Sequence, residues 1–139
     1  LGQIIRTSEC AGIDGILISE YKTVGLTNSV LQVSQGAFLN IPIYKIGNIS
    51  QTLEMFKKEG FWIIGVENSI KASNWYDIDL SEKIILIFGS EGKGIRKNTL
   101  KKCDFIVTIP MLGKINSLNI SASVSAILFE RNRQLLKSK

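Results

Sequence analysis

Residues 83–110 read KIILIFGSEGKGIRKNTLKKCDFIVTIP, and they decide the fold class of this chain. The apolar run at 83–88 predicts a buried strand, and a second strand is predicted at 105–109, where Pro110 stops it. Between the two strands lie a glycine-rich turn and a short basic helix that begins near Arg96. Two apolar strands joined through a helix are typical of a parallel sheet.

The rest of the chain repeats this alternation. Helical periodicity is followed by a short apolar strand in three earlier units, with helices at 1–11, 27–39 and 51–59 and strands at 15–19, 43–46 and 61–66. Thr27 or Asn28 is a possible cap of the second helix, Ser50 opens the third, and a last helix is predicted at 118–136. We therefore predict an α/β fold with a mostly parallel sheet and helices on both faces.

Composition excludes several classes of protein. The 139 residues are 45% hydrophobic and carry a formal net charge of +5, which suits one globular domain. The absence of histidine excludes Ser-His-Asp chemistry and most catalytic zinc sites, so no metal is expected. Cys10 and Cys103 lack a CxxC pattern, which favours buried or half-buried thiols in a reducing compartment. No apolar run approaches the roughly 20 residues of a membrane span, so we expect a cytoplasmic protein.

The turn GSEGKG follows the predicted strand at 83–88 and is the first candidate for a ligand site. Ligands of open α/β sheets bind beyond the carboxyl ends of the strands. Gly89, Gly92 and Gly94 permit positive φ angles and close approach of the backbone to a small molecule. The order of the residues matches neither a Walker A loop nor a dinucleotide fingerprint, which disfavours ATP and NAD. A plain strand-to-helix turn is the alternative.

A cluster of cations follows this turn. Lys93, Arg96, Lys97, Lys101 and Lys102 lie within ten positions without an intervening acid. On a short helix several of them would lie side by side, which favours a patch that binds phosphates. The alternative is a solvated surface helix with ordinary lysines.

Four further polar residues are candidates that mean little singly. Ser117 and Asn119 precede the last predicted helix, where capping is their ordinary role. Arg6 lies in an amphipathic helix and is ordinarily a surface residue, and Glu91 is ordinarily a turn acid.

Three ordered motifs together resemble a known family. LGQIIRTSECAG at 1–12, LIFGSEGKGIRKNTLKKCDFIVTIPM at 86–111 and KINSLNISASVSAILFE at 114–130 look like the motifs of the SpoU (TrmH-type) RNA ribose 2′-O-methyltransferases of the SPOUT superfamily. The segments SVLQVSQGAF and EGFWIIG also resemble the family, so the likeness covers nearly the whole chain. Among the branches, the chain is most similar to bacterial enzymes that methylate a guanosine ribose of large-subunit ribosomal RNA.

The resemblance implies an α/β fold with a C-terminal trefoil knot, a homodimer, and S-adenosylmethionine as methyl donor. Carried onto this chain, it implies a donor site formed by a defined set of residues: Gly89, Ile109 and Leu118, with Ser34, Gly36, Gly92 and Met111 nearby. It implies a polar catalytic group as well: Arg6, Glu91, Ser117 and Asn119, with Arg6 acting in the partner's active site.

Physical chemistry is compatible with these residue types. Methyl transfer from a sulfonium requires an oxygen lined up behind the methyl carbon, so positioning lowers much of the barrier without a metal. Arg6 is interpreted first as an anchor for an RNA phosphate and only second as a proton acceptor, because the guanidinium pKa is high. Ser117 and Asn119 would orient the ribose, and the cations after Gly94 would attract RNA.

The sequence alone leaves open the RNA substrate and which part of the whole protein these residues form. Transfer RNA is an alternative substrate, and an RNA-binding domain of this fold without catalysis is an alternative function. In the family an asparagine precedes the leucine that is Leu1 here, and many relatives carry an RNA-binding domain upstream. We therefore expect 1–139 to be the catalytic domain, with the upstream domain and the start of the first motif outside it.

Overall fold

The computed structural model of the chain describes residues 1–20, 27–69, 71–90 and 92–137. Its helices are α1 (Gly2–Cys10), α2 (Asn28–Val33), the 3-10 helix η1 (Ala37–Leu39), α3 (Ile49–Lys58), α4 (Lys97–Leu100) and α5 (Ile120–Lys137). Its strands are β1 (Ile16–Ser19), β2 (Ile43–Ile46), β3 (Trp62–Val66), β4 (Ser73–Asn74), β5 (Ile84–Phe88) and β6 (Phe105–Thr108). The predicted alternation of helices and strands is confirmed, except that β3, β4 and β5 follow one another without an intervening helix.

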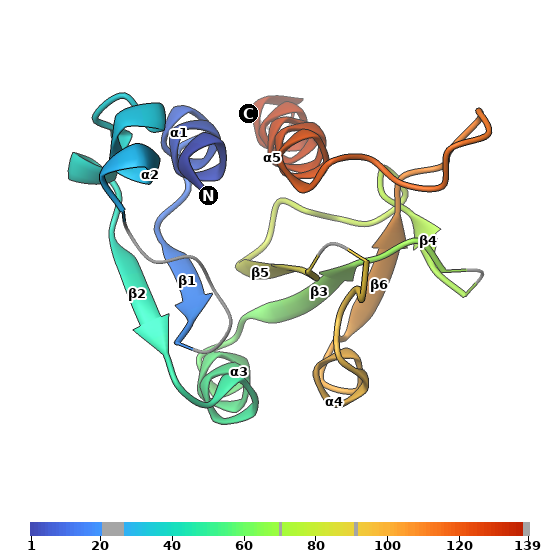
Figure 1. The fold of residues 1–139 in the computed structure, drawn as a ribbon. Helices are drawn as coiled ribbons and strands as arrows, with labels where there is room; N and C mark the ends of the chain where they lie inside the picture. The colour runs from blue at the N-terminus through green and yellow to red at the C-terminus, as the bar shows by residue number, and fades with distance from the viewer. Residues whose placement is uncertain (21–26, 70, 91, 138–139) are drawn as a thin grey trace.

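The strands pair in parallel throughout. The larger sheet has the order β4-β6-β3-β5, so β3 lies between the two strands of the stretch 83–110. β1 and β2 form a second parallel pair beside β5 (Figure 1). The predicted mostly parallel sheet is confirmed, although its strands divide into two hydrogen-bonded sets. Since β3, β5 and β6 run in the same direction, their carboxyl ends meet at one edge.

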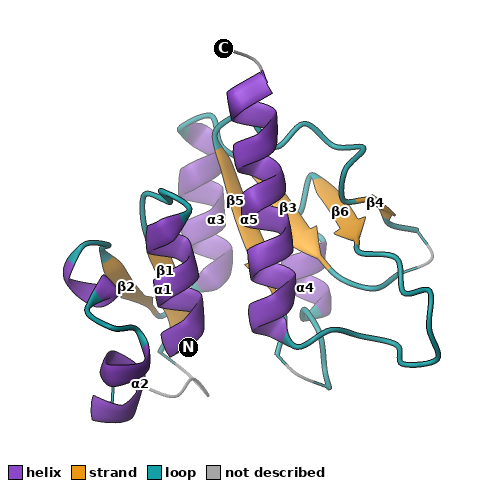
Figure 2. Ribbon diagram, turned by 90° about the horizontal axis from the view of Figure 1, so that it is seen from above, coloured by secondary structure: helices purple, strands orange, loops and turns teal. Residues whose placement is uncertain are grey.

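Helices cover both faces of the sheet. α1, α2 and α5 lie on one face and α3 and α4 on the other (Figures 1 and 2). The main core forms where α5 packs on the larger sheet, and its members have no exposed surface: Ile64, Leu80, Val107 and Ile127. A second cluster joins α1 to α5 through Ala11, Val124 and Leu128. Burial of these aliphatic side chains is the main stabilising contribution in this layer.

The single helix predicted at 27–39 is wrong. Thr27 does cap α2, because its side chain accepts a hydrogen bond from the Val30 amide at 3.2 Å. The helix then ends at Val33, and the chain turns through Gln35 and Gly36, whose φ angles are 53° and 83°. Left-handed backbone cannot continue an α-helix, so a separate turn of 3-10 helix follows.

Other local predictions need smaller corrections. The third helix begins earlier than expected, because Asn48 rather than Ser50 caps it, accepting from the Gln51 amide at 3.0 Å. Cys10 is exposed rather than buried, and Cys103 is half-buried. The basic helix α4 has only four residues.

Over the described ranges, no helix combines the length and apolar character needed to cross a membrane.

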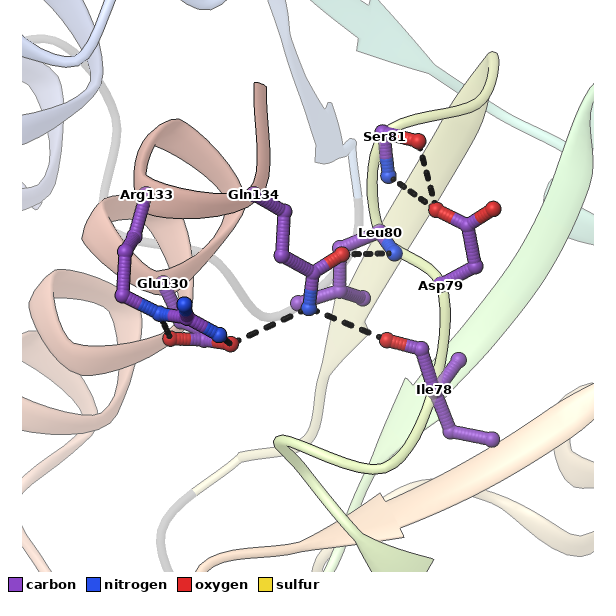
Figure 3. Close-up of polar contacts among 7 residues, drawn as sticks. All are labelled: Ile78, Asp79, Leu80, Ser81, Glu130, Arg133 and Gln134. Atoms are coloured by element: carbon purple, nitrogen blue, oxygen red, sulfur yellow. Dashed lines mark hydrogen bonds and ion pairs between the residues drawn. The ribbon is translucent and has the colours of Figure 1, made fainter. Parts of the chain in front are cut away.

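The last turns of α5 hold the segment that leads into β5 (Figure 3). The Gln134 side chain accepts from the Leu80 amide at 2.7 Å and donates to the Ile78 carbonyl at 3.1 Å. Its amide nitrogen also donates to Glu130, which accepts two bonds of 2.8 Å from Arg133. Gln134 therefore satisfies backbone groups that the irregular segment cannot satisfy by itself.

Candidate active site

A pocket of about 570 Å³ lies where the carboxyl ends of β3, β5 and β6 meet. Its walls come from the end of β3 at 66–68, from the glycine-rich turn at 88–90 and 92–94, and from the stretch between 108 and 123. The volume falls within the roughly 300–1,000 Å³ usual for small-molecule sites. The position agrees with the rule that open α/β sheets bind ligands beyond the carboxyl ends of their strands.

The glycine-rich turn forms one wall, and its shape requires the glycines. The Gly94 amide donates to the Ser90 carbonyl at 3.0 Å, and φ is 84° at Gly92 and 68° at Gly94. A Cβ atom on Gly89 would collide with the backbone of Gly94 and Ile95. The turn is therefore packed against itself and presents main-chain groups to the pocket. It is a pocket wall, which favours the ligand-binding interpretation over a plain connecting turn.

The opposite wall is the segment between β6 and α5. Residues 112–119 are all exposed, and 116–119 line the pocket before α5 begins. Asn119 caps α5, because its side-chain oxygen accepts from the Ser121 amide at 2.8 Å. The capping role predicted for Asn119 is confirmed, and the same residue also lines the pocket. Ser117 and Leu118 line it beside Asn119.

The structure brings most of the predicted site residues together. Those that line the pocket are Gly89, Gly92, Ile109, Met111, Ser117, Leu118 and Asn119. Glu91 lies outside the described residues. Gly89, Ile109 and Leu118 come from three separate segments, so their meeting is a property of the tertiary structure.

Ser34 and Gly36 do not line the pocket. Ser34 is fully buried, and its hydroxyl donates to the Leu31 carbonyl at 2.7 Å. Gly36 supplies the left-handed residue before η1. Both therefore have clear structural roles in the turn between α2 and η1, and their assignment to the donor site stays a prediction.

Arg6 also lies away from the pocket of its own chain. It is exposed on α1, and within the described part of the chain it forms no ion pair. α1 packs against α5, α2 and η1. Arg6 is therefore not among the residues that line the pocket of its own chain.

The basic cluster is smaller than the sequence suggests. Lys102 forms an ion pair with Glu54 at 2.7 Å, which holds the pKa of that carboxyl below its ordinary value. Lys93 lines the pocket, while Arg96, Lys97 and Lys101 are exposed. Four cations of the predicted patch thus remain available to a polyanion, and Lys93 is the one of them that lines the pocket.

Glu67 and Asn68 are among the pocket residues that sequence reasoning missed. They follow β3 directly, and the Glu67 carboxylate accepts from the Ile95 amide at 3.0 Å. Asn68 donates to the Asn116 carbonyl at 2.8 Å. Polar residues placed directly after an apolar strand were the available signal, because the carboxyl end of a parallel strand is where ligands bind.

Other positions offer less chemistry. A second hollow of about 500 Å³ is lined by residues 38–43, none of which carries a charge. Over the described residues, no group of three or more acidic or cysteine side chains could hold a metal ion. The pocket at the strand ends is therefore the candidate active site.

The parallel sheet, the glycine-rich turn and the pocket define a small-molecule-binding α/β domain, and the comparisons identify its family. The SpoU rRNA Methylase family matches residues 1–129, and the chain belongs to this family. A Staphylococcus saprophyticus protein assigned to the TrmH family of tRNA/rRNA methyltransferases is 36% identical over 141 aligned residues. The alignment covers 100% of this chain and 56% of that protein, so the chain spans about half the length of this relative.

Solved structures show the same fold. The TrmH/SpoU tRNA modifying enzyme of A. aeolicus superposes with a TM-score of 0.90 at 28% identity, over 99% of this chain and 69% of that one. The AdoMet-bound rRNA methyltransferase of Sinorhizobium meliloti has a TM-score of 0.89 at 26% identity, over 97% and 51%. The family and the parallel α/β fold that the sequence motifs implied are thus confirmed.

Proposed function

We propose that this chain is the catalytic domain of an RNA ribose 2′-O-methyltransferase that uses S-adenosylmethionine. The observation that carries the proposal is the meeting of Gly89, Ile109 and Leu118 in one pocket. These residues come from the motifs that imply a donor site, and membership of the SpoU family supports the same assignment.

The pocket residues fit the methyl donor. Phe88, Ile109 and Leu118 supply apolar surface for a flat base, and the main chain of the glycine-rich turn supplies polar groups. Because Gly89 has no side chain, the turn can pack closely against its own backbone and keep its main-chain groups at the pocket. When bound, S-adenosylmethionine supplies an electrophilic methyl group on a positively charged sulfur.

The polar side of the pocket suits the acceptor. Ser117 and Asn119 lie on the segment that covers the pocket, where their side chains would orient a ribose hydroxyl toward the donor. When the hydroxyl is held in line with the methyl group, its translational freedom is already lost on binding. The reaction therefore does not have to lose that freedom in reaching the transition state, which lowers the barrier. The proposed roles of Ser117, Asn119 and Glu91 in catalysis come from the family motifs.

We propose further that the active unit is a homodimer. Arg6 is exposed and does not line the pocket of its own chain, which leaves it accessible to a second copy, and the family resemblance implies that it acts in the partner's site. In that site Arg6 would anchor an RNA phosphate and keep the acceptor nucleotide in place. The C-terminal trefoil knot implied by the resemblance stays a prediction; the adjacency of the two loops that wall the pocket supports it.

For the substrate we propose large-subunit ribosomal RNA, with a guanosine as the modified nucleotide. The S. meliloti relative is an rRNA methyltransferase, which supports ribosomal RNA, whereas the A. aeolicus relative is a tRNA modifying enzyme. The bacterial relatives and an RNA substrate also support action in the cytoplasm. Lys93 at the pocket and the exposed cations that follow it would give RNA binding that weakens steeply with salt.

Two measurements test the proposal. Calorimetric titration with S-adenosylmethionine should show binding to a single site per chain; absence of binding at millimolar donor would leave the alternative of an RNA-binding domain without catalysis. Incubation with labelled donor and either ribosomal or transfer RNA, followed by mapping of the modified ribose, identifies the substrate. Label on a base instead of a 2′-oxygen would contradict the proposed reaction.

A further inference from the structure

Two consecutive residues at the end of β3 each reach a different wall of the pocket. β3 is an internal strand of the larger sheet, and Ile63 and Ile64 within it have no exposed surface. Glu67 and Asn68 follow this strand directly. The fixed strand therefore ends in two polar side chains at the pocket.

Glu67 holds the glycine-rich turn. Its own amide donates to the Val107 carbonyl at 3.0 Å, which fixes its backbone to β6. Its carboxylate accepts from the Ile95 amide at 3.0 Å, at the point where the turn ends. A Cβ atom on Gly94 would lie 2.5 Å from the same carboxylate oxygen, so the glycine leaves the space that the carboxylate occupies.

Asn68 holds the opposite wall. Its side-chain nitrogen donates to the Asn116 carbonyl at 2.8 Å. Ser117 and Leu118 follow Asn116 directly and line the pocket. Among the described residues, this is the hydrogen bond that ties the exposed segment 112–118 to the sheet.

We propose that Glu67 and Asn68 are positioning residues that set the separation between the two pocket walls. The inference rests on the proposed function, because it assigns the two residues to binding of the methyl donor. Glu67 acts through the position of the glycine-rich turn, and Asn68 acts through the position of Leu118. Glu67 does not act through its negative charge on the donor. An uncharged group that accepts the same hydrogen bond can therefore replace its carboxylate.

The opposite end of β3 provides a matched control. Asp104 accepts from the Ile63 amide at 2.8 Å, which is the same type of bond between a carboxylate and a backbone amide. Asp104 does not line the pocket. Asp104→Leu and Glu67→Leu therefore each leave one backbone amide of this region without its acceptor, and only Glu67→Leu alters the pocket.

The test measures the affinity of the full chain for S-adenosylmethionine by calorimetry, with thermal unfolding recorded for every variant. We expect Glu67→Leu to weaken donor binding about tenfold, whereas the donor affinity of Glu67→Gln should stay within about threefold of that of the original chain. Asp104→Leu should lower the unfolding temperature without changing donor affinity. Asn68→Ala should weaken donor binding about fivefold, and Asn74→Ala, an amide on β4, should leave it unchanged.

The outcomes separate the two proposals. If the original chain binds the donor and Glu67→Leu binds it equally well, or Glu67→Gln fails to restore binding, the positioning role is wrong while the proposed function stands. If Asp104→Leu weakens binding as much as Glu67→Leu, the effect is one of general stability and the inference also fails. A folded original chain that binds no donor overturns the proposed function, and this inference with it.

Discussion

Replacing Gly89 with alanine should weaken donor binding at least about a hundredfold while leaving the domain folded. A Cβ atom at this position would lie far inside the 3.0 Å limit that real Cβ atoms respect, against backbone atoms of Gly94 and Ile95. Backbone cannot rotate away as a flexible side chain can. The glycine-rich turn must therefore shift as a unit, and it forms a wall of the pocket.

The size of the effect follows from two costs. Overpacking of this kind destabilises a protein by about 1–3 kcal/mol. For a domain of this length, about 2 kcal/mol corresponds to a fall of roughly 8 °C in the unfolding temperature. A shift of the turn by about 1 Å should weaken donor binding at least about a hundredfold, which corresponds to about 2.7 kcal/mol.

Two other glycines are compared in the same assay. Gly92 lines the pocket and has a φ of 84° with open space around it, so Gly92→Ala should cost about 1 kcal/mol of backbone strain and weaken donor binding less than Gly89→Ala does. Gly113 lies in open space, and Gly113→Ala should be nearly neutral. Calorimetry and thermal unfolding are measured for all three. Wild-type donor affinity in Gly89→Ala would show that the turn does not form the donor site.

Three further predictions concern other parts of the chain. Arg6→Ala should lower methylation of RNA at least about a hundredfold with unchanged donor affinity, measured by label transfer and calorimetry; loss of donor binding as well would contradict its role as an RNA anchor. The bonds from Arg133 hold the pKa of Glu130 below its ordinary value of 4.5, so their contribution to stability is present above that value and is lost as the pH falls through the lowered pKa. Acidification from about pH 6 to about pH 3.5 should therefore lower the free energy of unfolding less in Glu130→Gln than in the original chain, as measured by denaturant unfolding. Equal losses would argue against a contribution of Glu130 to the pH dependence of stability. Burial raises the pKa of the Cys103 thiol to about 11, so iodoacetamide near pH 8 should modify the exposed Cys10 first. Mass spectrometry of peptides measures the two rates of modification, and equal rates would show that Cys103 is not protected.

Much of the fold was predictable because its strands are short apolar runs with clear ends. The strand at 43–46 has the predicted bounds, and the strand predicted at 83–88 forms at Ile84–Phe88. The break in the helix predicted at 27–39 was harder to predict, because Gln35 adopts a φ of 53° that few residues other than glycine tolerate. Its apolar periodicity continues across the break, so the pattern alone indicated one helix.

The candidate site was predictable only in part. The motifs identified Gly89, Ile109 and Leu118, and the strand-end rule identified the loops that carry them. The hydrogen bond between Glu67 and Ile95 joins residues 28 positions apart, and no local pattern indicates such a pair. The ion pair between Lys102 and Glu54 likewise removes one cation from the predicted patch, through a contact between α3 and the end of α4.

By itself, the sequence determined the class of the fold, the order of its elements and the family, because apolar periodicity and ordered motifs are local properties of the chain. The tertiary structure decided which loops share a pocket, that Arg6 lies outside it and that Glu67 and Asn68 reach its two walls. The physical reason is the order of the strands: β3 lies between β5 and β6, and only that long-range pairing brings three distant loops to one edge.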